Sequence, residues 1–68
     1  MKVVSGKRMV KVLEGKGWYL DRITGSHHIM KKTGMDYSIT VPVHGNNDLK
    51  IGTQITVMKV ADLTDSDL

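Results

Sequence analysis

The fold is decided by the stretch Trp18–Lys32, which has the sequence WYLDRITGSHHIMKK. Apolar and polar residues alternate imperfectly before Thr24-Gly25-Ser26, and these three residues have the composition of a tight turn. After the turn, His27, Ile29 and Lys31 alternate in position with His28, Met30 and Lys32. A period of two places successive side chains on opposite faces of a strand. The stretch therefore predicts a β-hairpin in which His27 and His28 point to opposite faces of the sheet.

A third strand is predicted after the Thr33-Gly34 turn. It would place four apolar side chains on one face, namely Tyr37, Ile39, Val41 and Val43. Pro42 cannot donate a ladder hydrogen bond, so we expect it at an edge or at the end of this strand. Together with the hairpin, the pattern predicts a three-stranded antiparallel meander.

A helix is predicted before the hairpin, from about Gly6 to Lys16. Ser5 is suited to cap it, Val4 and Met9 occupy the positions of a hydrophobic staple, and Gly17 ends it. Its expected buried stripe consists of Met9, Val10, Val12 and Leu13, and its expected solvent side consists of Lys7, Arg8, Lys11 and Glu14.

The segment after the third strand is compatible with two structures. Residues 44–48 have the composition of a loop, and Thr53 would then cap a second helix. The apolar face of that helix would consist of Ile55, Val57, Met58, Ala61 and Leu63. The residues Ile51, Thr53, Ile55 and Val57 also alternate, however, and their β-branched side chains favour a fourth strand. Residues 62–68 form an acidic tail that either adds a helical turn or frays.

Length and composition predict one small soluble domain spanning residues 1–68, with a thin core. No cysteine is present, so disulfides and thiolate metal ligands cannot stabilise it. No apolar run approaches the roughly 20 residues needed to cross a bilayer, and no secretory signal follows Met1-Lys2. We therefore expect a cytoplasmic protein without membrane contact.

The formal charge of +3 is unevenly distributed along the chain. Residues 1–34 carry eight Lys and Arg against two acidic residues, whereas residues 35–68 carry two against five. A basic half suits a polyanion, because each neutralised phosphate releases condensed counterions. Lysines that only keep a small protein soluble would explain the charge equally well.

Four short motifs stand in an order that resembles the HicA (YcfA-like) toxin family. They are Gly17-Trp18, Gly25-Ser26-His27-His28, Val41-Pro42-Val43-His44-Gly45 and Gly52-Thr53. The Gly-Ser-His motif followed by Val-Pro-x-His is the specific part, and the resemblance spans nearly the whole chain. It implies an α+β fold like a double-stranded RNA-binding domain, α-β-β-β-α, with both helices on one face of the sheet and helix rather than strand from Thr53 onward. The last element, Gln54–Val60, departs from the family in having a single lysine.

The resemblance also implies a function, that of an endonuclease that cuts mRNA without the ribosome and is held inactive by a HicB-type antitoxin. Metal-independent cleavage needs a base for the 2′-hydroxyl proton and an acid for the departing 5′-oxygen. Histidine serves both roles near neutral pH, because its unperturbed pKa is about 6.5. The resemblance assigns the catalytic role to His27, directly after Gly-Ser. His28 is the reserve candidate, since a register slip of one residue would exchange the two.

Other residues are expected to assist. His44 is a possible acid or substrate-orienting group, although a loop-capping role explains it equally well. Gly25 and Ser26 would bring backbone N–H groups and a hydroxyl to a phosphate, and an ordinary hairpin turn also explains them. The further candidates for RNA contact are Lys7, Arg8, Lys11, Arg22, Lys31 and Lys32. Trp18 is expected in the core, whereas Tyr19 remains free to stack on a base.

The sequence therefore predicts a toxin that is monomeric when free, acts on RNA and requires no cofactor or metal. A three-histidine metal site is not expected, because His27 and His28 diverge. The alternative is a non-catalytic double-stranded-RNA-binding module of the same fold. A third possibility is a regulatory protein that meets an acidic partner without touching RNA.

Overall fold

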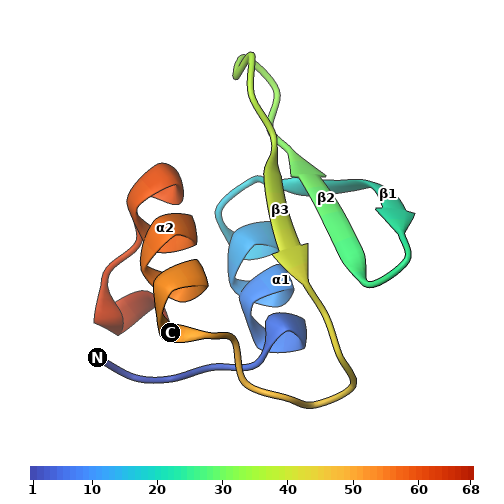
Figure 1. Cartoon of the computed structure of the whole chain (residues 1–68). Helices are drawn as coiled ribbons and strands as arrows, with labels where there is room; N and C mark the ends of the chain where they lie inside the picture. Colours follow the sequence, from blue (N-terminus) through green and yellow to red (C-terminus); the bar gives the residue numbers. More distant parts are fainter.

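The computed structural model describes residues 1–68 and has two layers, a pair of helices on one side and a three-stranded sheet on the other (Figure 1). The elements in chain order are α1 (Gly6–Gly15), β1 (Tyr19–Thr24), β2 (His27–Lys31), β3 (Ile39–Pro42), α2 (Ile51–Ala61) and a short 3₁₀ turn, η1 (Asp65–Asp67). The strands are antiparallel in the order β1-β2-β3. The predicted α-β-β-β-α order is confirmed, and the last segment is helix rather than strand. Neither helix has the length and apolar character needed to span a membrane.

Local sequence explains where α1 begins and ends. Ser5 is extended, and its hydroxyl accepts a hydrogen bond from the Arg8 backbone N–H at 3.1 Å, as expected of an N-cap. The helix ends at Gly15, and Gly17 follows with a φ of 95°. Val4 and Met9, the two predicted staple positions, are both buried. The predicted helix is thus confirmed to within one residue at its C-terminal end.

The β1–β2 hairpin explains the imperfect alternation in the sequence. Thr24 pairs with His27, so the turn contains only Gly25 and Ser26. Gly25 has a φ of 59° and Ser26 has a negative φ, which is the pattern of a type II′ turn. The register shifts between Leu20 and Arg22, which leaves Asp21 as an extra residue. This bulge places Leu20 and Ile23 on the same face although they are three positions apart.

Strand β3 is shorter than predicted, because its pairing with β2 ends at Met30 and Ile39. Beyond that point β2 pairs only with β1, so Tyr37 lies in the β2–β3 loop and the prediction that it belongs to the third strand was wrong. Val43 lies just past the strand, yet its backbone N–H still donates to the Ser26 carbonyl at 2.8 Å. Pro42 is the last residue of β3, as predicted.

Helix α2 begins at Ile51, so the prediction of Thr53 as its cap was wrong. The N-cap is Lys50, whose side chain forms no capping bond, and the first turn closes through the Gln54 N–H and the Lys50 carbonyl at 2.9 Å. Thr53 is therefore already the third residue of the helix.

The buried side of α2 contains a polar residue that the sequence pattern did not reveal. Gln54 is fully buried, accepts from the Val4 N–H at 3.1 Å and donates to the Lys2 carbonyl at 2.6 Å. These bonds tie the chain's N-terminal segment to α2. Because Gln54 faces inward, Ile55 is turned outward and is 39% exposed, contrary to its predicted place on the apolar face.

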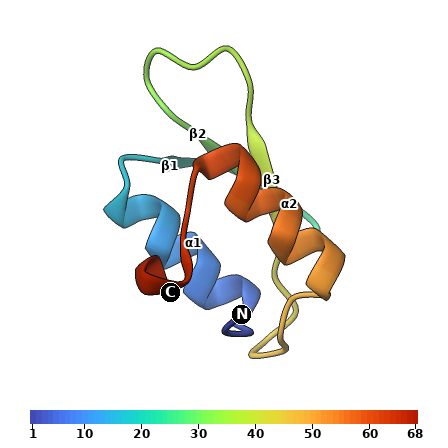
Figure 2. The ribbon, with the colours of Figure 1, turned by 90° about the vertical axis from the view of Figure 1, so that its left-hand side faces the viewer.

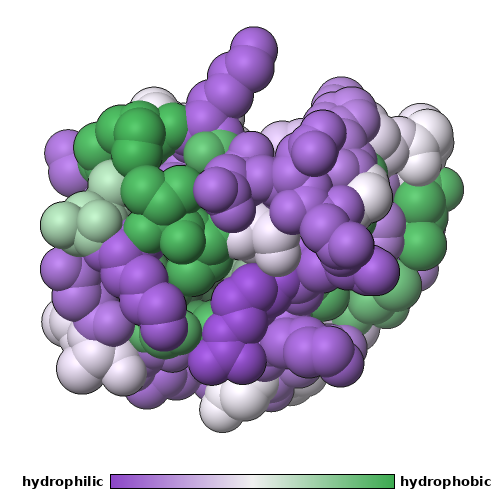
Figure 3. All heavy atoms as spheres, turned by 90° about the horizontal axis from the view of Figure 1, so that it is seen from below, coloured by the Kyte–Doolittle hydropathy of each residue, from purple (hydrophilic) through white to green (hydrophobic).

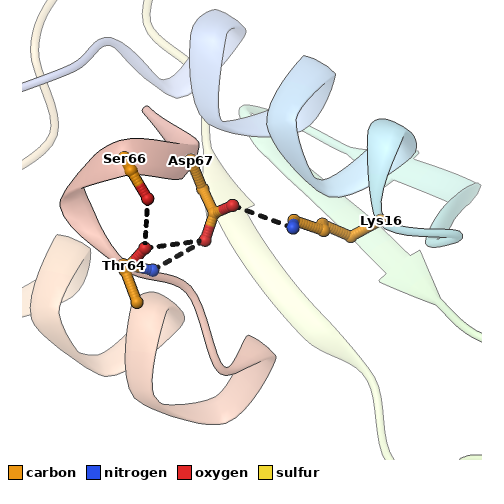
Figure 4. A network of polar contacts seen from close by, with 4 residues as sticks. All are labelled: Lys16, Thr64, Ser66 and Asp67. Carbon is orange, nitrogen blue, oxygen red and sulfur yellow. Dashed lines mark hydrogen bonds and ion pairs between the residues drawn. The ribbon is translucent and has the colours of Figure 1, made fainter.

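The acidic C-terminal segment folds back against α1 (Figure 2). Leu63 and Leu68 are buried, and the Leu68 carbonyl accepts from Lys2 Nζ at 3.1 Å and from Arg8 Nη2 at 3.3 Å. The Asp67 carboxylate accepts from Lys16 Nζ and from the Thr64 backbone N–H, each at 2.8 Å (Figure 4). The tail thus adds a turn rather than fraying.

Helix α1 begins in direct contact with the end of β3, and only glycine fits there. A Cβ added to Gly6 would lie 2.2 Å from the Pro42 carbonyl oxygen and 3.1 Å from Val43 Cα. Both are backbone atoms, which cannot move aside as a flexible side chain would. The position of α1 over the sheet therefore depends on the missing side chain.

We predict that Gly6→Ala lowers the free energy of unfolding by about 1–3 kcal/mol or more, because α1 and β3 must separate. The matched variant Gly15→Ala, in the same helix with open space around it, should be neutral or stabilising by up to about 1 kcal/mol. Urea unfolding followed by circular dichroism measures both. Equal stabilities of the two variants would contradict the close contact.

A second prediction concerns acid stability. The Lys16 side chain, followed by the Thr64 backbone N–H, lowers the pKa of the Asp67 carboxyl. A folded-state pKa below the unfolded one stabilises the fold above the unfolded pKa, and this contribution is lost as pH falls through the folded pKa. Asp67→Asn should therefore lower Tm at neutral pH, and the difference should shrink as the pH falls below about 4. Thermal scans across pH test this, with Asp36→Asn, which removes a carboxylate outside any ion pair, as the control. A Tm difference that does not change with pH would contradict it.

Candidate nucleic-acid interface

The sheet leaves one face uncovered, because both helices pack on the other (Figure 1). Met30 is fully buried on the helix side, so the alternation of β2 directs His27, Ile29 and Lys31 to the open side. Cross-strand partners share a face, which adds Arg22 opposite Ile29. The open face thus carries one histidine and two cations.

His27 stands at the start of β2, directly after the turn. It is exposed, and its cross-strand neighbours are Thr24 on β1 and Pro42 on β3. Arg22 holds the Asp21 carboxylate at 2.6 Å, yet its side chain stays 60% exposed. A large ligand can therefore reach both His27 and Arg22 from solvent.

His28 lies on the face of the sheet opposite to that of His27, as predicted. It is half-buried, and its Nδ1 atom is buried without a hydrogen-bond partner. Together with residues of α1 and the end of β3 it lines a cavity of about 330 Å³, whose other lining residues are Lys7, Val10, Lys11, Glu14 and Val43. A lysine pair and a carboxylate thus surround His28, while His27 lies on the open face with Arg22 and Lys31.

The predicted RNA-contacting residues do not form one surface. Arg22 and Lys31 lie on the open face, and Lys7 and Lys11 lie beside His28 on the helix side. Arg8 donates to the Leu68 carbonyl and so turns toward the C-terminal segment. Lys32 borders a different hollow, next to Trp18 and Tyr37.

His44 follows β3, two residues past the cross-strand partner of His27. It is exposed and lines a hollow of about 360 Å³ together with Pro42 and the loop that precedes α2. The Gly25-Ser26 turn is attached to the same corner through the bond between the Val43 N–H and the Ser26 carbonyl. The turn, His27 and the chain leading to His44 are therefore neighbours.

Two aromatic residues have the predicted surroundings and one was missed. Trp18 is buried, as predicted, and Tyr19 is 48% exposed. Tyr37 was predicted in the third strand and was not singled out as a candidate, but its side chain is 43% exposed in the β2–β3 loop. In the sequence, only its closeness to the predicted Thr33-Gly34 turn indicated that Tyr37 could lie in a loop.

On the face that Figure 3 shows, exposed apolar side chains lie at two sides of the molecule. Seen from below, hydrophilic residues cover the centre, and apolar ones lie toward α2 and toward β1. On α2 they include Ile51 and Ile55, and on β1 they include Leu20 and Ile23, which the helices leave uncovered.

A protein-family model described as "HicA toxin of bacterial toxin-antitoxin" matches residues 6–63. The matched range starts at the first residue of α1 and ends just beyond α2, so it includes the hairpin turn and all three histidines. No curated protein matches the chain.

A prediction for the Gly25-Ser26 turn separates its role in stability from its proposed role in RNA binding. Gly25→Ala should lower the free energy of unfolding by about 1–2 kcal/mol, because a Cβ is strained at a φ of 59°. Ser26→Ala should leave stability unchanged, since only the Ser26 backbone is used by the fold, while weakening RNA binding if the hydroxyl contacts a phosphate. Unfolding curves and RNA titrations of both variants measure this. Ser26→Ala that is as unstable as Gly25→Ala would show that its side chain is structural.

Proposed function

This chain belongs to the HicA toxin family of bacterial toxin–antitoxin systems, and we propose that it is a metal-independent endoribonuclease that cleaves mRNA in the cytoplasm. The family match over residues 6–63 carries the proposal, because members of this family are known as ribonucleases. The open sheet face supplies the residue types that the reaction requires.

The proposed step is a transesterification within the RNA. His27 removes the proton from a 2′-hydroxyl, the resulting oxygen attacks the adjacent phosphorus, and the bond from phosphorus to the 5′-oxygen breaks. The leaving oxygen takes a proton from a second group, for which we propose His44. The products are a 2′,3′-cyclic phosphate and a free 5′-hydroxyl, so protons and bonds balance without a metal ion.

Exposure favours His27 over His28 as the base. A phosphodiester in a polymer can reach a side chain on an open face, whereas His28 faces α1 and has a buried ring nitrogen. The open face also supplies cations for the negative charge that develops on the phosphate, from Arg22 and Lys31. Gly25 and Ser26 would add a hydroxyl and backbone N–H groups beside His27.

The toxin family implies an antitoxin as partner, and we propose a HicB-type protein that binds the free monomer. An antitoxin that covers the open face would exclude RNA from His27. The non-catalytic RNA-binding module remains the second candidate, favoured by the double-stranded RNA-binding-domain-like arrangement of the same elements.

The test is cleavage of a labelled RNA by purified protein in excess chelator, comparing wild type with His27→Ala and His28→Ala. Loss of a general base typically costs about 10²- to 10⁴-fold in rate, which we expect for His27→Ala. His28→Ala should retain most activity once corrected for the folded fraction measured by circular dichroism. His44→Ala should fall between the two.

The results distinguish the candidates. Unchanged cleavage in His27→Ala together with loss in His28→Ala would move the site to the helix-side cavity. Binding of RNA without cleavage by the wild type would identify the non-catalytic module instead. Cleavage abolished by the chelator would contradict a metal-independent reaction.

A further inference from the structure

An open hollow of about 670 Å³ lies where the β2–β3 loop meets the open face of the sheet. Its lining residues are Arg22, Lys31, Met35, Asp36, Tyr37 and Ser38. Arg22 and Lys31 share the open face with His27, so the hollow and the proposed catalytic histidine lie on one continuous surface. Neither the family match nor the proposed mechanism assigns a role to the loop residues.

The hollow contains an aromatic ring that is held in place and still accessible. Tyr37 is 43% exposed, and its ring lies 6.1 Å from that of buried Trp18 at an interplanar angle of 49°. This contact restrains the ring from one side. A ring that is ordered in advance can stack on a flat ligand without losing much conformational freedom.

The charged groups of the hollow indicate what that ligand is. Lys31 and Arg22 suit a phosphate, and Arg22 remains exposed although it also pairs with Asp21. The Asp36 carboxylate would repel a phosphate unless it pairs with N–H donors of the same ligand. An unpaired nucleotide of RNA has all three parts, a phosphate, a flat base and a base edge that can carry donors. An acidic protein segment would meet the same cations but would gain nothing from Asp36.

We propose that this hollow binds one unpaired nucleotide of the RNA and prefers guanine, with Tyr37 stacking on the base and Asp36 accepting from its Watson–Crick edge. Guanine presents a ring N–H and an amino group side by side, which match the two carboxylate oxygens. Uracil presents one N–H between two carbonyl oxygens, and these repel the carboxylate. This inference rests on the proposed function, since it treats RNA as the ligand.

The position of the hollow sets where the guanine would lie relative to the cleaved bond. His27 and Lys31 are four residues apart on β2, or about 13 Å at a strand's rise of about 3.3 Å per residue. That length corresponds to about four stacked nucleotides at about 3.4 Å each, or to fewer nucleotides if the RNA is extended. The site would therefore give the enzyme a guanine preference at a fixed, short offset.

The experiment measures binding of 2′-O-methyl oligonucleotides, which cannot be cleaved because the attacking hydroxyl is blocked. Two pyrimidine oligonucleotides are compared by fluorescence anisotropy, one with a single guanine and one with uracil in its place. Wild type should bind the guanine oligonucleotide about 10-fold more tightly, as expected for one good base contact. Tyr37→Ala should weaken binding of both by about 5- to 100-fold, whereas Tyr37→Phe should retain it.

Asp36→Asn tests the selectivity separately. It should reduce the preference for guanine toward unity and leave uracil binding equal or tighter. Asp65→Asn, which changes an exposed carboxylate in η1, should change neither. Equal binding of the two oligonucleotides by wild type, or unchanged affinity in folded Tyr37→Ala, would overturn the proposal. Weakened binding of an antitoxin with unchanged RNA binding in Tyr37→Ala would also overturn it and make the hollow a protein-binding site.

Failure of the proposed function would look different. Because the oligonucleotides are never cleaved, a guanine preference lost in Asp36→Asn supports the site even if wild type fails to cut ordinary RNA. Conversely, cleavage by wild type with no base preference in binding would leave the ribonuclease activity intact and remove only the nucleotide site.

Discussion

The close contact between Gly6 and the Pro42 carbonyl is the constraint on which the rest of the structure depends. It places the start of α1 against the end of β3, and the next residue, Val43, donates to the Ser26 carbonyl of the hairpin turn. The helix start, the end of β3 and the turn before His27 thereby meet at one corner. Both of these contacts at the corner beside the candidate histidine involve backbone atoms, so they leave the surrounding side chains available for a ligand.

The core is thin, and contacts that hold the N-terminal and C-terminal segments against the helices add to it. Only 16 of 68 residues are buried, and nearly all of the apolar ones belong to the single cluster between helices and sheet. Gln54 holds the N-terminal segment, and Leu68 and Asp67 hold the C-terminal one against α1. Because all of these ties lie on the helix side, none of them has to break for a polymer to reach the open face.

The features predicted correctly from sequence are those that nearby residues determine. Ser5 caps α1 through a bond to Arg8 three positions away, and the period of two in β2 separates His27 from His28. The errors arise from distant partners. Gln54 is buried because it meets backbone groups some 50 positions earlier in the chain, which turns Ile55 outward. Tyr37 is in a loop because β2 pairs with β3 only as far as Met30.

The distribution of charge shows why the candidate site was only partly predictable. Counting residues suggested one basic half, but the rotation of α1 over the sheet sends its lysines to the side of His28, away from Arg22 and Lys31. The C-terminal segment then engages Lys2, Arg8 and Lys16. Fewer cations therefore face any one ligand than the sequence implies. Under the proposed function, selection of RNA would therefore depend more on the particular groups around His27 than on net charge.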